Sequence, residues 1–170
     1  MSKLTEWEKW NFSLDKGKER LNDFNNWHIL NYKNIDNIPE KPGVYILAQR
    51  CMSLVSKKLE AKPINRFLNS DTHGLLDIGE AVNLKLRISQ FLACVSKKDT
   101  EGHMAGWRLG SLNLLSKMGC TVNDLIFSYL PLASKGKAYE WEGILLNVYF
   151  DLFGELPPLN YKFNWSAFKD

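Results

Sequence analysis

The chain has 170 residues, of which 45% are hydrophobic, and its 22 Lys and Arg against 19 Asp and Glu leave a formal charge of +3. This length suffices for one hydrophobic core but is short for two full domains, and the mild positive charge neither requires nor excludes a polyanionic partner. Three separated cysteines form no disulfide framework or zinc motif, and no apolar run reaches the roughly 18 residues of a membrane span. We therefore expect a soluble, cytoplasmic protein with no membrane partner.

The first predicted element is an amphipathic helix from Thr5 to about Trp27. Its apolar residues recur mostly three, four or seven positions apart, with charged residues between them. We interpret residues 1–38 as an N-terminal helical extension and residues 39–170 as the main domain.

Two strands are predicted next. The run GVYILAQ, which begins at Gly43, is rich in β-forming residues and suits a central strand. The stretch that follows, about residues 49–72, is too long for a tight hairpin, and we interpret it as an insertion. Leu75 to Ile78 predicts the second strand, and Gly79 predicts the turn after it.

The remaining elements are mostly helical. A helix after Gly79 is indicated by Leu84, Ile88 and Phe91 on one face, and another is predicted over residues 105–117. The run DLIFSYLPL predicts a third strand, and the last helix ends at Gly154, a typical C′ residue. The order strand, strand, helix, helix, strand, helix predicts an α+β layer structure.

Several polar residues stand beside glycines, at strand ends or within apolar stripes, and each has an ordinary structural interpretation as well as a functional one. A tyrosine such as Tyr45 often packs on a half-buried sheet, Arg87 and Glu142 fit solvated helix faces, and Asn160 fits a turn. The chain has no Ser-His-Asp order, glycine-rich phosphate loop or histidine-rich metal spacing, so triad hydrolases and NTP-binding proteins are not indicated.

The order of the pieces is more informative than any one of them. PGVYIL, LLDIGEAVNLKLRI, EGILLNVY and PPLN, spread over residues 42–160, resemble the GIY-YIG nuclease superfamily. The specific part is the spacing from Gly79 through Asn83 to Arg87. The resemblance implies a small three-stranded antiparallel sheet flanked by helices. It also implies site roles for the tyrosine of the first motif, the catalytic arginine, the metal-binding glutamate and the active-site asparagine, which match Tyr45, Arg87, Glu142 and Asn160.

The implied activity is hydrolysis of phosphodiester bonds in double-stranded DNA by a monomer or homodimer. A single Mg²⁺ or Mn²⁺ on Glu142 would compensate charge on the phosphoryl group, and the planar guanidinium of Arg87 would bind the non-bridging oxygens. The Tyr45 hydroxyl would orient or deprotonate the attacking water. Basic residues and one histidine are predicted to contact the nucleic acid: Lys57, Lys58, Lys85, His103 and Arg108.

The departure from the family pattern is Asp77, which stands where the family has the YIG tyrosine. Three explanations are open: Asp77 serves as general base or extra metal ligand, it inactivates an intact scaffold, or the site has turned to binding. The alternative function is therefore a catalytically inactive nucleic-acid-binding module of the same fold. An ordinary protein-interaction domain that uses the Trp-rich N-terminal segment is a third hypothesis, and no specific residue favours it.

Overall fold

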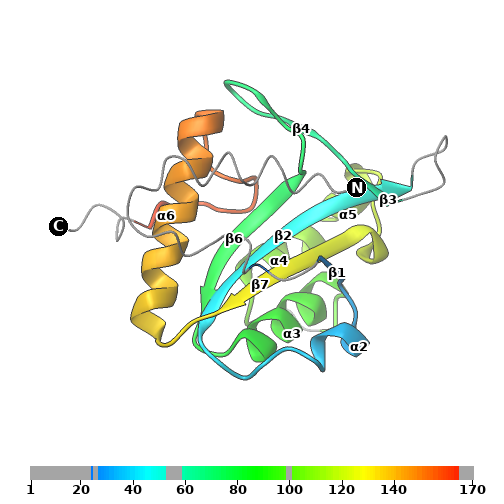
Figure 1. Ribbon diagram of the computed structural model, residues 1–170. Coiled ribbons are helices and arrows are strands. Elements are labelled where there is room, and N and C mark those ends of the chain that lie inside the picture. The colour runs from blue at the N-terminus through cyan, green and yellow to red at the C-terminus, as the bar shows by residue number, and fades with distance from the viewer. Residues whose placement is uncertain (1–23, 25–26, 53–58, 99–100, 165–170) are drawn as a thin grey trace.

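The computed structural model describes residue 24 and residues 27–52, 59–98 and 101–164. The predicted N-terminal helix lies almost entirely outside these residues. In chain order the elements are β1 (His28–Ile29), α2 (Tyr32–Ile35), β2 (Gly43–Met52), β3 (Leu59–Ala61), β4 (Ile64–Asn65), β5 (Ser70–Asp71), β6 (Leu75–Ala81), α3 (Leu84–Val95), α4 (Met104–Ser111), α5 (Leu114–Lys117), η3 (Val122–Asp124), β7 (Leu125–Pro131) and α6 (Lys135–Phe153). The α+β class predicted from the sequence is confirmed (Figure 1).

The sheet is antiparallel and has β2 at its centre. β6 pairs with one edge of β2 and β7 with the other, which are the three strands that the sequence predicts. The sheet is nevertheless wider than predicted, because β1 pairs with the outer edge of β7 and β3 pairs with Arg50–Met52 at the end of β2. Strands as short as β1 and β3 show no alternation that periodicity could detect.

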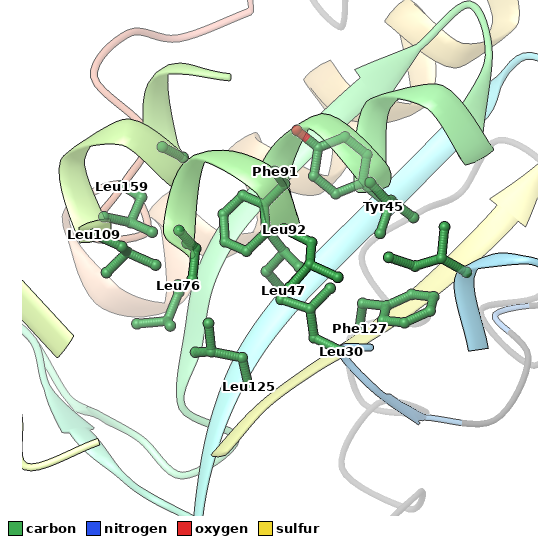
Figure 2. Packing of buried hydrophobic residues seen from close by; sticks show 14 of the residues in the cluster. Leu30, Tyr45, Leu47, Leu76, Phe91, Leu92, Leu109, Leu125, Phe127 and Leu159 are labelled. Carbon is green, nitrogen blue, oxygen red and sulfur yellow. The ribbon is translucent and has the colours of Figure 1, made fainter. Parts of the chain in front are cut away.

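Helices cover both faces of the sheet (Figure 1). α3 and α4 lie over one face, where Tyr45, Leu47 and Phe127 point, and α6 lies over the other, where Val44 and Ile46 point. Alternate residues of β2 thus enter different cores, as the period of a strand requires. Figure 2 shows the first core, in which Tyr45 packs with Leu47, Phe91 and Leu92. A central strand buried on both faces explains the continuous apolar run in the sequence.

Local signals set the ends of the main helices. α3 begins after Asn83, whose side chain accepts a hydrogen bond from the Leu86 N–H at 3.0 Å. α6 ends at Gly154, which has φ of 72° in the left-handed region, as predicted. The single helix predicted over residues 105–117 is wrong: Asn113 adopts φ of 54° and divides it into α4 and α5. Asparagine tolerates this conformation better than most residues, so the break has only a weak sequence signature.

The segment before β2 belongs to the main domain. β1 extends the sheet, and Leu30, Ile35 and Ile38 are buried in the core under α3. The boundary predicted after residue 38 therefore falls inside a packed unit that begins no later than His28. No helix in the described part of the chain is long and apolar enough to cross a membrane.

Candidate functional site

A pocket of about 290 Å³ lies beside β6, between the C-terminal segment, α3, α4 and α6. Its walls include every residue that the sequence predicts as catalytic, together with the glycine of the second motif and the histidine predicted to contact nucleic acid: Tyr45, Asp77, Gly79, Arg87, His103, Glu142 and Asn160. These side chains come from positions up to 115 residues apart in the sequence, from Tyr45 to Asn160. The fold thus gathers them at one place.

The pocket forms at the edge of β6 that faces away from β2. This edge pairs with no strand among the described residues; the C-terminal segment and α6 cover it instead. The Asn160 side chain accepts a hydrogen bond from the Ile78 N–H at 3.0 Å and donates one to the Ile78 carbonyl at 2.7 Å. Two residues further along β6, the Glu80 N–H donates to Glu142 Oε1 at 3.3 Å. Asn160 and Glu142 therefore hold the strand that carries Asp77 and Gly79.

Gly79 makes room for Tyr45. The two residues are register partners across β6 and β2, and a methyl group on Gly79 would lie 2.2 Å from the Tyr45 hydroxyl oxygen. The glycine of this motif is therefore required by close packing. The Tyr45 side chain crosses its partner and reaches the pocket with its hydroxyl group.

The Tyr45 hydroxyl lies between two polar groups. It is within 3.3 Å of Asp77 Oδ2 and 2.9 Å of His103 Nε2, and all three residues are at least nine-tenths buried. Burial, with the Asp77 charge in addition, raises the pKa of Tyr45 well above its usual range. This tyrosine keeps its proton at neutral pH, so deprotonation of water by Tyr45, one of the two roles predicted from the sequence, is not supported by its surroundings.

His103 is the N-cap of α4. Its Nδ1 accepts a hydrogen bond from the Gly106 N–H at 3.4 Å, and its ring meets that of Phe91 edge to face, with centroids 5.0 Å apart. Burial, followed by the nearby positive charge of Arg87, lowers the pKa of His103 to about 3. The sequence suggests a nucleic-acid contact at this position, whereas the structure places a buried, neutral histidine against Tyr45 in the pocket lining.

Asp77 is only 5% exposed although it lines the pocket. Burial raises its pKa to about 7, the Tyr45 hydrogen bond and the positive charge of Arg87 lower it, and the charge of Glu142 raises it again. A carboxyl group with such a pKa exchanges protons near neutral pH, which is the property that a general base or acid needs. Asp77 therefore places an ionisable group in the pocket lining.

Glu142 is held from two sides. Its Oε1 accepts from the Glu80 N–H, and its Oε2 accepts from Asn164 Nδ2 at 2.6 Å. Burial raises the pKa of Glu142, and the neighbouring Glu80 carboxylate raises it further. Glu80 and Asn164 also line the pocket but carry no signal in the predicted motifs. Only the fold shows that they adjoin Glu142.

The basic residues have varied settings. Arg87 Nη1 donates to the Gly102 carbonyl at 2.7 Å, which fixes the guanidinium beside Tyr45, Asp77 and His103. Arg108 donates to the Leu159 carbonyl at 3.0 Å and so anchors the C-terminal segment. Lys85 Nζ reaches the Asp36 carbonyl at 3.4 Å, outside the pocket lining. The predicted contacts Lys57 and Lys58 lie outside the described residues.

No family model, curated protein or solved structure matches the chain. Among the described residues, no group of three or more His, Cys, Asp and Glu side chains is arranged to hold a metal ion.

Proposed function

We propose that this chain is a metal-dependent endonuclease of GIY-YIG type that hydrolyses phosphodiester bonds in DNA. The observation that carries the proposal is convergence: the residues that the resemblance to the GIY-YIG superfamily singles out line one pocket. Chance placement of Tyr45, Arg87, Glu142 and Asn160 on separate elements would scatter them over the surface. Their types also suit the reaction, because a scissile phosphate needs cationic donors, a metal-binding carboxylate and a proton acceptor.

Arg87 is suited to bind the phosphate. One guanidinium nitrogen is fixed by the Gly102 carbonyl, so the side chain enters the site with a set orientation. A guanidinium keeps its charge at any physiological pH and offers several planar donors to the non-bridging oxygens. Arg87 would therefore position the phosphate and stabilise charge that builds up on it.

A divalent cation fits the carboxylates on the other wall of the pocket. Glu80 Oε2 is buried without a hydrogen-bond partner, and its charge lies close enough to raise the pKa of Glu142. Two neighbouring carboxylates, one with an unpaired buried oxygen, suit a hard cation that prefers oxygen ligands. Glu142, with Glu80 beside it, would hold Mg²⁺ or Mn²⁺, which supplies Lewis-acid stabilisation of the phosphate when bound.

The remaining residues prepare the site. Asn160 holds β6 through Ile78, and Asn164 orients Glu142, so both act on the geometry of other groups. Tyr45 keeps its hydroxyl proton and donates within the pocket. The main alternative is a binding module that keeps this pocket but does not turn over. It is favoured by one observation, that both oxygens of Glu142 already accept hydrogen bonds within the protein.

The test is cleavage of supercoiled plasmid DNA by the full chain with Mg²⁺ or Mn²⁺ and with EDTA. The proposal predicts metal-dependent nicking that falls at least about 100-fold in Glu142→Ala and Arg87→Ala. Glu140→Ala is the matched control, because Glu140 is on the same helix but 47% exposed and paired with Lys137. Retention of cleavage in Glu142→Ala would overturn the metal-site assignment.

The alternative predicts a different set of results. A binding module would cut no DNA with either metal yet would bind it with an affinity that falls steeply with salt concentration. Cleavage that appears only in Asp77→Tyr would show that the scaffold is intact and that Asp77 silences it. A chain that neither cuts nor binds DNA would exclude both functions.

A further inference from the structure

His103, Tyr45 and Asp77 form a hydrogen-bond chain whose direction the fold determines. The Gly106 N–H donates to Nδ1 of His103, so the lone pair of this nitrogen faces the helix and the neutral ring carries its proton on Nε2. Nε2–H then donates to the Tyr45 oxygen at 2.9 Å, and the Tyr45 hydroxyl donates to Asp77 Oδ2 at 3.3 Å. Each hydrogen bond in this series therefore determines whether the next group acts as donor or acceptor.

The hydrogen-bond chain ends at Asp77, which is the one of its three residues that can take a proton near neutral pH. His103 stays neutral because burial lowers its pKa to about 3, and its Nδ1 lone pair is occupied. Tyr45 keeps its proton because its pKa is raised. Among the described residues, the Tyr45 hydroxyl donates to Oδ2 of Asp77, and the Asp77 side chain also lines the pocket.

Charged groups from three further elements act on Asp77. Arg87 on α3 and Arg108 on α4 favour its ionised form, whereas Glu142 on α6 opposes it. With Tyr45 on β2, these are the groups whose charge or hydrogen bond shifts its pKa. The positive charges of the two arginines favour the ionised carboxylate of Asp77, whereas burial alone would favour the neutral acid.

We infer that His103 and Tyr45 orient the Asp77 carboxylate toward the pocket, where Asp77 accepts the proton of the attacking water. This inference rests on the proposed nuclease function. His103 and Tyr45 are positioning residues, because they act through Asp77. This hydrogen-bond chain also explains how Asp77 can stand in place of the second-motif tyrosine, because Tyr45, the tyrosine of the first motif, becomes its hydrogen-bond donor.

The proton balance of the step is simple. The water oxygen forms a bond to phosphorus, and one water proton passes to Asp77. The bond between phosphorus and the leaving oxygen breaks with its electron pair on that oxygen, which takes a proton from bulk water. Asp77 then returns its proton to bulk water, so the net reaction adds one water molecule across the phosphodiester.

The first experiment is independent of catalysis. Nitrogen-15 NMR of the full chain, with the His103 signals assigned by comparison with His103→Gln, reports which ring nitrogen carries the proton. We expect the Nε2-protonated form throughout pH 5 to 9, without titration. An Nδ1-protonated ring, or protonation of His103 with a midpoint near its usual 6.5, would overturn the hydrogen-bond chain.

The second experiment is kinetic. His103→Asn keeps a good N-cap residue but is too short to reach Tyr45, so it separates the helix from the hydrogen-bond chain. We expect kcat to fall about 10- to 100-fold in His103→Asn and Tyr45→Phe with KM within twofold, as for other residues that orient a reactive group. His103→Gln, which can still donate to Tyr45, should recover part of the loss. Tyr32→Phe, at a 47% exposed tyrosine outside the pocket, is the control and should behave as the unchanged chain.

Two results separate the failures. Metal-dependent cleavage that survives unchanged in His103→Asn and Tyr45→Phe would overturn the inference and leave the nuclease proposal standing. The absence of any cleavage by the unchanged chain would overturn both the nuclease proposal and the acceptor role of Asp77, whatever tautomer His103 shows.

Discussion

The side-chain amide of Asn160 pairs with the main chain of Ile78 as a neighbouring β-strand would. It satisfies both the N–H and the carbonyl group of Ile78, with distances of 3.0 and 2.7 Å. Ile78 lies between Asp77 and Gly79 on β6, so this contact fixes the strand on which the site depends. An asparagine that the sequence suggests as an active-site residue is thus also a structural clamp.

Replacement of Asn160 should release this edge. Asn160→Ala leaves the Ile78 N–H and carbonyl without protein partners and should lower the free energy of unfolding by about 1 to 3 kcal/mol. Urea unfolding measures the loss, and amide hydrogen exchange should show faster exchange of the Ile78 N–H. Asn69→Ala is the control, because Asn69 makes one exposed hydrogen bond to the Leu152 carbonyl and should cost less than about 1 kcal/mol. Equal losses in the two variants would contradict the role of Asn160 as a clamp.

Asp71 should be essential for stability rather than activity. Its fully buried carboxylate accepts hydrogen bonds from the main-chain N–H groups of His73, Gly74 and Leu75 and from the Tyr149 hydroxyl. Asp71→Ala leaves these buried donors unsatisfied, and we expect a loss of at least about 3 kcal/mol in thermal or urea unfolding.

Tyr149→Phe provides the matched variant for Asp71. It removes one donor only and should cost about 1 kcal/mol in the unchanged chain. In an Asp71→Asn background the same change should cost less, because the acceptor has lost its charge. A double-mutant cycle measures this coupling, and additive losses would show that the Tyr149–Asp71 contact contributes nothing.

Gly79→Ala should disrupt the site through space alone. Its methyl group would overlap the Tyr45 ring and hydroxyl, and overpacking of this kind typically costs about 1 to 3 kcal/mol. In the proposed nuclease, cleavage should fall as well, because the displaced Tyr45 can no longer contact Asp77. Gly136→Ala is the control, because its methyl group would lie 3.8 Å from Ser134 Oγ, an ordinary van der Waals contact. Alanine also favours the helix, so the free energy of unfolding should stay the same or rise. A neutral Gly79→Ala would mean that Tyr45 can move without cost.

The stability of the chain should depend on pH through Asp77. Its pKa is about 7 in the folded protein against 3.8 ordinarily, so the folded state binds a proton more tightly than the unfolded state does. The resulting stabilisation is complete below pH 3.8 and is lost as the pH rises through 7. Asp77→Asn cannot ionise and loses nothing over this range.

A comparison of the unchanged chain with Asp77→Asn measures this pH-dependent contribution to stability. From pH 4 to pH 8, the free energy of unfolding of Asp77→Asn should rise relative to the unchanged chain by up to about 4 kcal/mol, at ~1.4 kcal/mol for each pKa unit. Urea unfolding of both proteins in matched buffers gives the difference at each pH. A difference that does not vary with pH would show that Asp77 is not a buried titrating group.

Periodicity and capping signals were sufficient for the main elements. Leu84, Ile88 and Phe91 on one face defined α3, and Gly154 defined the end of α6, because such patterns report local burial and backbone conformation directly. The short strand β1 was not predictable, because it depends on pairing with the distant strand β7, and the break at Asn113 has only a weak sequence signature.

The sequence by itself determined which residues are brought together. The resemblance carried by motif order and by the spacing from Gly79 to Arg87 singled out side chains from separate elements, and these side chains line one pocket. The N-terminal helix and the insertion lysines lie outside the described residues and stay predictions.

Only the tertiary structure decided what these residues do to one another. Burial and partner geometry make His103 neutral, keep Tyr45 protonated and bring the pKa of Asp77 to about 7, and none of these properties belongs to a residue type. They arise because groups from different parts of the chain are buried together, where each charge and each hydrogen bond acts on its neighbours more strongly than in water.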